Sequence, residues 1–292
     1  MIPEFLQDKL NEYYPDNYSD ITDSYSKGKK ESIRVNTIKC DFNEVISYLN
    51  DNNISYEEVD NIKNALVINN HIEILKESSL YDEGKIYFQS LSSQIPPFIV
   101  DPKNNEQILD MTAAPGGKTT EMAALSNNTA MITAIEKNKI RFDRLSYNIE
   151  KQGAKKVSVL KEDARNLNEY FIFDKILLDA PCSGSGTITN NDFSKISNEL
   201  VENSVATQKE LIKEAIKHLK LNGILVYSTC SILKDENENI VKEVLDNNPN
   251  IVLEPIEFNG LKTLPTTLEG TITIMPNDYY EGFFVAKLKR VK

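Results

Sequence analysis

From Gln107 onward, short apolar segments alternate with longer segments of helical periodicity, and this alternation limits the possible fold more than any other feature of the sequence. Predicted strands span residues 107–111, 130–136, 157–161, 175–179 and 223–228. Helices are predicted over 139–151, closed by Gly153, and over 208–220, whose apolar residues recur on one face. Apolar strands separated by helices are typical of a parallel sheet covered on both faces. The pattern predicts a doubly wound α/β domain over residues 101–292, with ligands bound beyond the carboxyl ends of its strands.

Residues 1–100 follow a different pattern, with shorter segments that include both predicted helices and predicted strands. A helix is predicted over 3–14, and strands over 32–38, 65–69 and 72–75. Asp41 followed by Glu44 gives the spacing of a helix N-cap with an acidic third residue, ahead of a helical apolar stripe. We therefore expect a small N-terminal α+β domain that packs against the larger one, since no low-complexity linker separates them.

Composition narrows the class of protein. Of 292 residues, 40% are apolar and 26% are charged, which is ordinary for a soluble protein, and no apolar run approaches the ~18 residues of a membrane span. The first residues lack the pattern of a secretory signal. Three cysteines, Cys40, Cys182 and Cys230, are too few for a disulfide framework or a zinc site and fit a reducing compartment. The expectation is a cytoplasmic protein without membrane or metal partners, and a monomer by default.

The net charge of −11 argues against a nucleic-acid partner only if the charges are evenly spread. Basic residues instead cluster in three segments, near 27–34, 137–156 and 287–292. Such clusters are usually solvated surface, and they can also contact phosphates. Charge alone leaves the partner open.

The segment 109–119, LDMTAAPGGKT, begins in the first strand of the α/β region and opens a helix. Paired glycines allow a close backbone approach to a ligand. The segment nearly matches the phosphate-binding loop G-x-x-x-x-G-K-[ST], with 175–179 as a candidate magnesium-binding strand. However, Thr112 stands at the first glycine, and Pro115 removes an N–H from the phosphate cradle. A nucleotide triphosphatase of the P-loop type is therefore a weakened alternative.

Acidic residues end three successive predicted strands: Asp110, Glu136 and Asp163. Glu136 lies 19 residues after Gly117, where a carboxylate can accept hydrogen bonds from both hydroxyls of a ribose. Asp163 is placed to meet an adenine edge. Three carboxylates suit a cationic, adenosine-bearing cofactor better than a triphosphate, so the pattern favours S-adenosylmethionine (SAM).

Two cysteines follow the next two predicted strands, Cys182 in DAPCSGSG (179–186) and Cys230 in STCS (228–231). In the usual order of this fold these strands are adjacent, so both thiols should face one crevice. A thiolate that adds to carbon 6 of a pyrimidine turns carbon 5 into a nucleophile that can take a methyl group. A protonated Asp179 could supply the proton or hydrogen bond needed at ring nitrogen 3, and Lys118 is the nearest candidate in sequence for activating the thiol.

These motifs, over about residues 89–289, resemble the RNA 5-methylcytosine methyltransferases of the NSUN and RsmB type, and are most similar to short archaeal members that act on tRNA. The segments RVNT (34–37), FQS (88–90) and GFFVAKL (282–288) also resemble signatures of that family. Thr112 stands where many members have cysteine. The resemblance implies that Cys230 is the nucleophile and that Cys182 helps to release the product. It also implies a SAM site formed by Thr112, Ala113, Ala114, Pro115, Gly116, Gly117, Lys118, Glu136, Asp163 and Asp179.

We therefore expect a Rossmann-like SAM-dependent methyltransferase that modifies RNA at cytosine carbon 5, with tRNA preferred over rRNA as the substrate. The target base must leave its stack to reach a thiol. Because the chain ends soon after the catalytic region, recognition is expected from the first hundred residues and the catalytic face, with residues 27–34 and a helix carrying Arg141 and Arg144 contacting phosphates. A methyltransferase acting on an exocyclic amine and a non-catalytic RNA-binding protein are the remaining alternatives.

Overall fold

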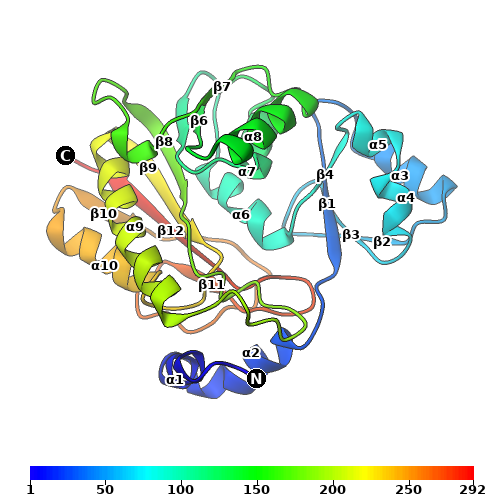
Figure 1. Ribbon diagram of the computed structural model, residues 1–292. Coiled ribbons are helices and arrows are strands. Elements are labelled where there is room, and N and C mark those ends of the chain that lie inside the picture. Colours follow the sequence, from blue (N-terminus) through cyan, green and yellow to red (C-terminus); the bar gives the residue numbers. More distant parts are fainter. The chain divides into compact units, whose positions relative to one another are not determined.

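The computed structural model describes residues 1–292 and divides into two compact units. One unit comprises Lys30–Asn166, and the other combines Met1–Lys29 with Leu167–Lys292 (Figure 1). The predicted boundary between an N-terminal domain and a catalytic domain at residue 100 stays a prediction. The two compact units combine residues from both sides of that boundary. None of the helices is long and apolar enough to cross a membrane.

The Lys30–Asn166 unit begins with an antiparallel sheet whose strand order is β2-β3-β1-β4. Its strands are β1 (Glu31–Val35), β2 (Tyr56–Glu58), β3 (Ala65–Ile68) and β4 (Ile86–Phe88), and its helices are α3 (Phe42–Asp51), α4 (Ile72–Lys76) and α5 (Ser79–Asp82). The prediction of a strand at 72–75 is wrong, since α4 is helical there. Leu75 is buried and Ile72 partly buried, three positions apart, whereas Ile74 between them is exposed, so the apolar spacing is that of a helical turn.

Three parallel strands follow in the same unit, in the order β5-β6-β7. They are β5 (Gln107–Asp110), β6 (Met131–Ile135) and β7 (Val157–Leu160), interleaved with α6 (Leu91–Val100), α7 (Gly117–Leu125) and α8 (Lys139–Lys151), and followed by the short helix η2 (Ala164–Asn166). The predicted helix 139–151 is confirmed. The Asn138 side chain accepts hydrogen bonds from two N–H groups of the first turn of α8, and Gly153 adopts a positive φ of 71° after its end.

The second unit contains a five-stranded part of the α/β fold. Strands β8 (Phe173–Asp179) and β9 (Leu219–Thr229) are parallel, β12 (Phe283–Arg290) is antiparallel to β9, and β10 (Ile251–Glu254) and β11 (Ile272–Ile274) are antiparallel to β12. Helix α9 (Asn198–Lys217) packs against β8 and β9, and α10 (Glu238–Asn247) packs against β10 (Figure 1). Helix α9 begins ten residues before the predicted start, where the side chain of Ser197 accepts a hydrogen bond from Leu200 N–H.

The first residues of the chain pack within this second unit as α1 (Glu4–Tyr13), η1 (Pro15–Asn17) and α2 (Tyr18–Tyr25). Their buried side chains share a hydrophobic cluster with residues from the loops after β8 and β9, among them Ile188 and Ile232. Tyr14 Oη donates a hydrogen bond to Ile232 O at 2.8 Å, and Tyr25 Oη donates to Ser185 O at 3.0 Å. The N-terminal helices therefore support the two loops that carry the cysteine motifs.

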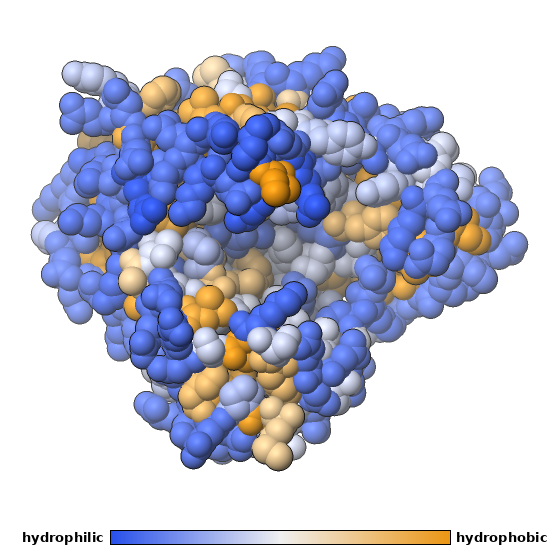
Figure 2. All heavy atoms as spheres, viewed as in Figure 1, coloured by the Kyte–Doolittle hydropathy of each residue, from blue (hydrophilic) through white to orange (hydrophobic).

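The surface seen in the orientation of Figure 1 is mostly hydrophilic, with hydrophobic residues in small separate groups (Figure 2). The most exposed large hydrophobic side chains after Met1 are Tyr170, Ile140, Leu221 and Tyr147, of which Ile140 and Tyr147 both lie on α8. Single exposed hydrophobic residues are normal for a folded protein in water.

Candidate functional site

The thiols of Cys182 and Cys230 lie 3.0 Å apart, sulfur to sulfur. Strands β8 and β9 are paired in parallel with Asp179 beside Ser228, so the loops that leave their carboxyl ends start side by side. Ala180 N donates to Ser228 O at 2.8 Å and Gly186 N donates to Cys230 O at 3.0 Å, which ties the two loops together. The structure thus brings together the two cysteines that the sequence placed on neighbouring strands.

The environment of Cys182 favours its neutral thiol. Its contact with the Cys230 sulfur, its burial and the nearby charge of Glu236 all hold the pKa of Cys182 well above the ordinary value of a thiol. A thiol in this state can donate a proton or a hydrogen bond, but at neutral pH it is a poor nucleophile. This asymmetry leaves Cys230 as the better candidate for nucleophilic attack.

Asp179 lies at the end of β8, beside the cysteine loops. Ser228 Oγ donates to Asp179 Oδ1 at 2.8 Å, and the Asp179 side chain is partly exposed. The carboxyl group therefore belongs to the same strand end as the thiols, as expected from the sequence. Its predicted proton donation to a base stays a prediction.

A buried carboxyl group that the sequence analysis missed lies behind the thiols. Glu236 is fully buried and accepts hydrogen bonds from Ser183 N at 2.7 Å, from Ser183 Oγ at 2.6 Å and from Ser231 Oγ at 2.5 Å. Burial raises the pKa of Glu236, and the hydrogen bonds from Ser183 and Ser231 oppose that rise. The available signal was the acid-rich run 235–238, whose last residue, Glu238, begins α10, but such runs are usually exposed.

The glycine-containing loop, in the other unit, is held in place from α8. Arg141 Nη2 donates to Ala114 O at 2.9 Å, and Asn148 Nδ2 donates to Pro115 O at 2.8 Å. Gly116 has a φ of +106°, and a Cβ there would lie 3.0 Å from a methyl carbon of Leu145, so glycine suits both the backbone and the packing.

The side chains of this loop are bonded within the same unit. Thr119 Oγ1 donates to Asp110 Oδ2 at 2.6 Å, and Lys118 Nζ donates to Ser93 Oγ at 2.8 Å. Lys118 and the thiols belong to different units, so its predicted effect on a thiol stays a prediction.

The two other predicted cofactor ligands follow β6 and β7. Glu136 is only 5% exposed; its Oε1 accepts from Asn138 N at 2.8 Å and its Oε2 lies 3.4 Å from Arg141 Nε. Asp163 accepts two hydrogen bonds from the Arg165 guanidinium, at 2.9 and 2.6 Å, and these hold the pKa of Asp163 well below its usual range. Both carboxylates thus stand at the carboxyl ends of adjacent parallel strands, and the partnership of Asp163 with Arg165 was not foreseen.

The two N-terminal signature segments meet behind this loop. Arg34 is 2% exposed, and its Nε donates to Gln89 Oε1 at 3.2 Å while its Nη2 donates to Thr120 Oγ1 at 2.9 Å. Gln89 Nε2 in turn donates to Glu121 Oε2 at 2.8 Å. The prediction that Arg34 contacts phosphates is therefore wrong, because its guanidinium is buried and bonded to α7.

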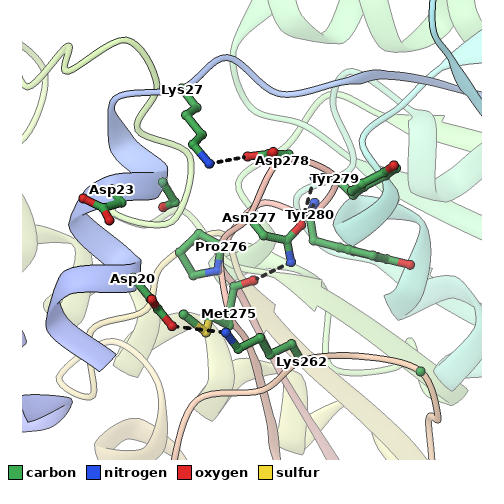
Figure 3. Close-up of a pocket in the computed structure, with 12 residues that line it drawn as sticks. Asp20, Asp23, Lys27, Lys262, Met275, Pro276, Asn277, Asp278, Tyr279 and Tyr280 are labelled. Atoms are coloured by element: carbon green, nitrogen blue, oxygen red, sulfur yellow. Dashed lines mark hydrogen bonds and ion pairs between the residues drawn. The ribbon is translucent and has the colours of Figure 1, made fainter. Parts of the chain in front are cut away.

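A separate pocket of about 520 Å³ is lined by α2 and the segment 275–280 (Figure 3). Across it, Lys27 pairs with Asp278 at 3.3 Å and Lys262 pairs with Asp20 at 3.1 Å. It contains none of the predicted catalytic or cofactor-binding residues, although Lys27 belongs to the segment 27–34 that was predicted to contact phosphates. Because both lysines that line it are paired with aspartates, we assign this pocket no ligand.

An α/β fold with parallel strands and a glycine-containing loop that opens a helix is typical of the class of Rossmann-like, cofactor-binding proteins. Residues 97–289 match the model of the family described as 16S rRNA methyltransferase RsmB/F, and residues 2–75 match the RsmF/B-like, ferredoxin-like domain. The chain belongs to the RsmB/F methyltransferase family, which confirms the resemblance drawn from the motifs.

Similar curated proteins include several ribosomal RNA small subunit methyltransferases F. The protein of Shewanella piezotolerans is 36% identical over 282 residues, which is 91% of this chain and 59% of the relative. The protein of Psychromonas ingrahamii is 39% identical over 224 residues, 72% of this chain and 46% of the relative. The chain thus spans about three fifths or less of the length of these curated relatives.

Solved structures agree with the fold. The structure of PH0851 superposes with a TM-score of 0.91 at 34% identity, covering 99% of this chain and 66% of that one. A methyltransferase homologue from Pyrococcus horikoshii superposes with a TM-score of 0.86 at 28% identity, and the match covers 99% of this chain and 100% of the homologue. The structure of NSun6 from Pyrococcus horikoshii with SFG superposes with a TM-score of 0.88 at 24% identity, and the match covers 99% of this chain and 98% of NSun6. At this identity the likeness supports the fold alone. The predicted doubly wound, Rossmann-like fold with a small N-terminal domain is confirmed.

Proposed function

We propose that this protein is a SAM-dependent RNA methyltransferase that modifies cytosine at carbon 5. The observation that carries the proposal is the pair of thiols 3.0 Å apart at the ends of two adjacent parallel strands, one of them held in its neutral form. Methylation of an exocyclic amine needs no thiol, and a P-loop triphosphatase does not explain the pair either. The reactants, RNA and SAM, and the free thiols fit a cytoplasmic enzyme.

The residues of the loop fit a SAM molecule. Glu136 is an almost fully buried carboxylate at a strand end, where it can accept hydrogen bonds from ribose hydroxyls. Gly116 has a positive φ and no side chain, so a ligand can approach the backbone closely at the start of α7. We propose that residues 112–118, Glu136, Asp163 and Asp179 hold SAM. When bound, SAM supplies an electrophilic methyl group.

In the proposed mechanism, the Cys230 thiolate adds to carbon 6 of a flipped cytosine and forms a C–S bond. Asp179 supplies a proton or hydrogen bond to ring nitrogen 3, so that electron density moves to carbon 5. Carbon 5 would then take the methyl group of bound SAM as its methyl–sulfur bond breaks, with S-adenosylhomocysteine as the leaving group. Transfer of the carbon-5 proton to solvent lets its electron pair re-form the ring double bond, so that the C–S bond breaks, the Cys230 thiolate leaves and the ring regains aromaticity. Cys182, in contact with the Cys230 sulfur, is placed to assist this release.

The RNA substrate is either tRNA or rRNA. The motif resemblance favours tRNA, as with the short archaeal members of the family. The names of the curated relatives favour small-subunit rRNA as the second candidate. We propose tRNA first, and the assay below compares the two directly.

The test is transfer of labelled methyl from SAM to total tRNA, to naked 16S rRNA and to small ribosomal subunits, followed by nuclease digestion and identification of the methylated nucleoside by mass spectrometry. We expect 5-methylcytidine with the wild type and none with Cys230→Ser. Cys40→Ser is the matched control, because Cys40 belongs to the other unit, and it should retain activity. Methylation by Cys230→Ser, or a product methylated on a nitrogen, would refute the proposed chemistry.

A further inference from the structure

Glu236 contacts both cysteine loops through the residues that follow the two cysteines. Ser183, next to Cys182, donates to Glu236 from its N–H and from its hydroxyl, at 2.7 and 2.6 Å. Ser231, next to Cys230, donates its hydroxyl at 2.5 Å. One carboxyl group therefore binds the two loops that leave β8 and β9, directly behind the pair of thiols.

Glu236 is held in place by further hydrogen bonds. The backbone carbonyl of Glu236 accepts a hydrogen bond at 2.6 Å from the hydroxyl of Tyr227, a buried residue of β9. Gln208 on α9 lies close, donating to Pro181 O at 2.9 Å and reaching Glu236 Oε1 at 3.4 Å. Because these neighbours are buried and bonded, they restrict the positions that the carboxyl group can take.

Asn237 extends the same arrangement along the Cys230 loop. Thr229 Oγ1 donates to Asn237 Oδ1 at 2.6 Å, and Asn237 Nδ2 donates to Ser231 O at 2.9 Å. The residues on both sides of Cys230 are therefore bonded to the segment 236–237. The Cys182 loop is bonded to the same segment, because Ser183 donates hydrogen bonds to Glu236.

We propose that Glu236 is a positioning residue that holds the Cys182 and Cys230 loops together, so that the two thiols stay in contact and only Cys230 is free to attack a base. The inference rests on the proposed function, which assigns the attack to Cys230. It adds a residue outside the predicted site that determines which of the two thiols reacts.

The charge of Glu236 acts in the same direction as its hydrogen bonds. Its negative charge is among the causes that raise the pKa of Cys182. Removing that charge should lower the pKa of Cys182 and increase its thiolate fraction, which rises about tenfold when the pKa falls by one. Glutamine at this position can still accept the Ser183 N–H but places an NH₂ donor against the hydroxyls of Ser183 and Ser231, so Glu236→Gln removes the charge and weakens the hydroxyl bonds to both loops.

The test measures the reactivity of each thiol in the protein without RNA, by iodoacetamide alkylation between pH 6 and 9 and peptide mass spectrometry. In the wild type, Cys230 should be alkylated much faster than Cys182. In Glu236→Gln, the ratio of the Cys182 alkylation rate to the Cys230 rate should rise several-fold, on the order of the effect of removing one nearby charge, and kcat for methyl transfer should fall while KM for SAM is unchanged. Glu238→Gln is the matched control, since Glu238 is an equally buried acid two residues away that is not bonded to the cysteine loops, and it should behave as the wild type.

The proposal would be overturned if the ratio of the Cys182 rate to the Cys230 rate were the same in Glu236→Gln as in the wild type. Glu236→Ala is a second variant, and the glutamine variant keeps the test valid if the alanine variant fails to fold. The alkylation readout needs neither RNA nor SAM. Failure of the proposed function would appear as an absence of methyl transfer by the wild type, independently of the alkylation ratios.

Discussion

Replacing Glu121 with glutamine is expected to stabilise the protein at alkaline pH and to have little effect near pH 4.5. Glu121 lies on α7 and is 1% exposed. Its Oε2 accepts from Gln89 Nε2, whereas its Oε1 has no hydrogen-bond partner. Burial raises the pKa of Glu121 to about 8, against the opposing effects of Arg34 and of the hydrogen bond from Gln89.

The sign and size of the effect follow from this raised pKa. The folded state binds the Glu121 proton more tightly than the unfolded state, in which the pKa is near 4.5. The stability contributed by this proton is fully present below pH 4.5 and is lost as the pH rises through 8. A tenfold difference in proton affinity corresponds to about 1.4 kcal/mol, so the free energy of unfolding should fall by up to about 5 kcal/mol across this window. Glutamine does not ionise and should not show this loss.

The assay is urea unfolding of wild type and Glu121→Gln at pH 5, 7 and 9, compared at equal m-values so that the same two states are measured. The difference in free energy of unfolding should grow with pH in favour of the variant. Glu150→Gln removes the same charge from an exposed position on α8 and should leave the pH dependence as in the wild type. Parallel pH profiles for wild type and Glu121→Gln would refute the reasoning.

Two further substitutions test the supports of the site. Gly186→Ala would place a Cβ 1.9 Å from Gly282 O, so the loop after β8 must move, and thermal unfolding should show a loss of about 3 kcal/mol or more. Arg141→Gln removes the bond to Ala114 O and the ion pair with Glu136, and calorimetry with S-adenosylhomocysteine should show about 5- to 30-fold weaker binding, from a loss of about 1–2 kcal/mol.

Each of these has a matched control. A Cβ on Gly28 would meet nothing within 4 Å, so Gly28→Ala should leave the unfolding temperature nearly unchanged. Arg144→Gln changes a neighbouring exposed arginine of α8 and leaves both contacts of Arg141 in place. Equal effects of the test and control variants would show that the named contacts are not the cause.

The α/β part of the fold was predictable because its strands are short, apolar and regularly followed by helical segments. Local signals sufficed for α8, where Asn138 and Gly153 mark the two ends. They also placed Cys182 and Cys230 at strand ends, and parallel pairing of β8 and β9 then brings the thiols together without further information. These features depend on periodicity and on residues close in sequence.

The remaining features depend on contacts between distant residues. Tyr14 bonds to the Ile232 carbonyl 218 positions later, and nothing in the local pattern of α1 indicates it. Glu236 lies in an acidic run that composition assigns to the surface, and only tertiary packing buries it between Ser183 and Ser231. Arg34 was assigned to a surface cluster for the same reason, because burial of a charge is not visible in sequence.

The most direct test of the account is a denaturing gel of Cys182→Ala after incubation with SAM and the RNA that the wild type methylates. The account predicts a slowly migrating band of protein covalently bonded to RNA, because Cys230 still attacks while release is impaired. The band should be absent from the double variant Cys182→Ala, Cys230→Ser. A covalent band that persists without the Cys230 thiol, or active methylation without that thiol, would contradict the central claim that Cys230 is the nucleophile.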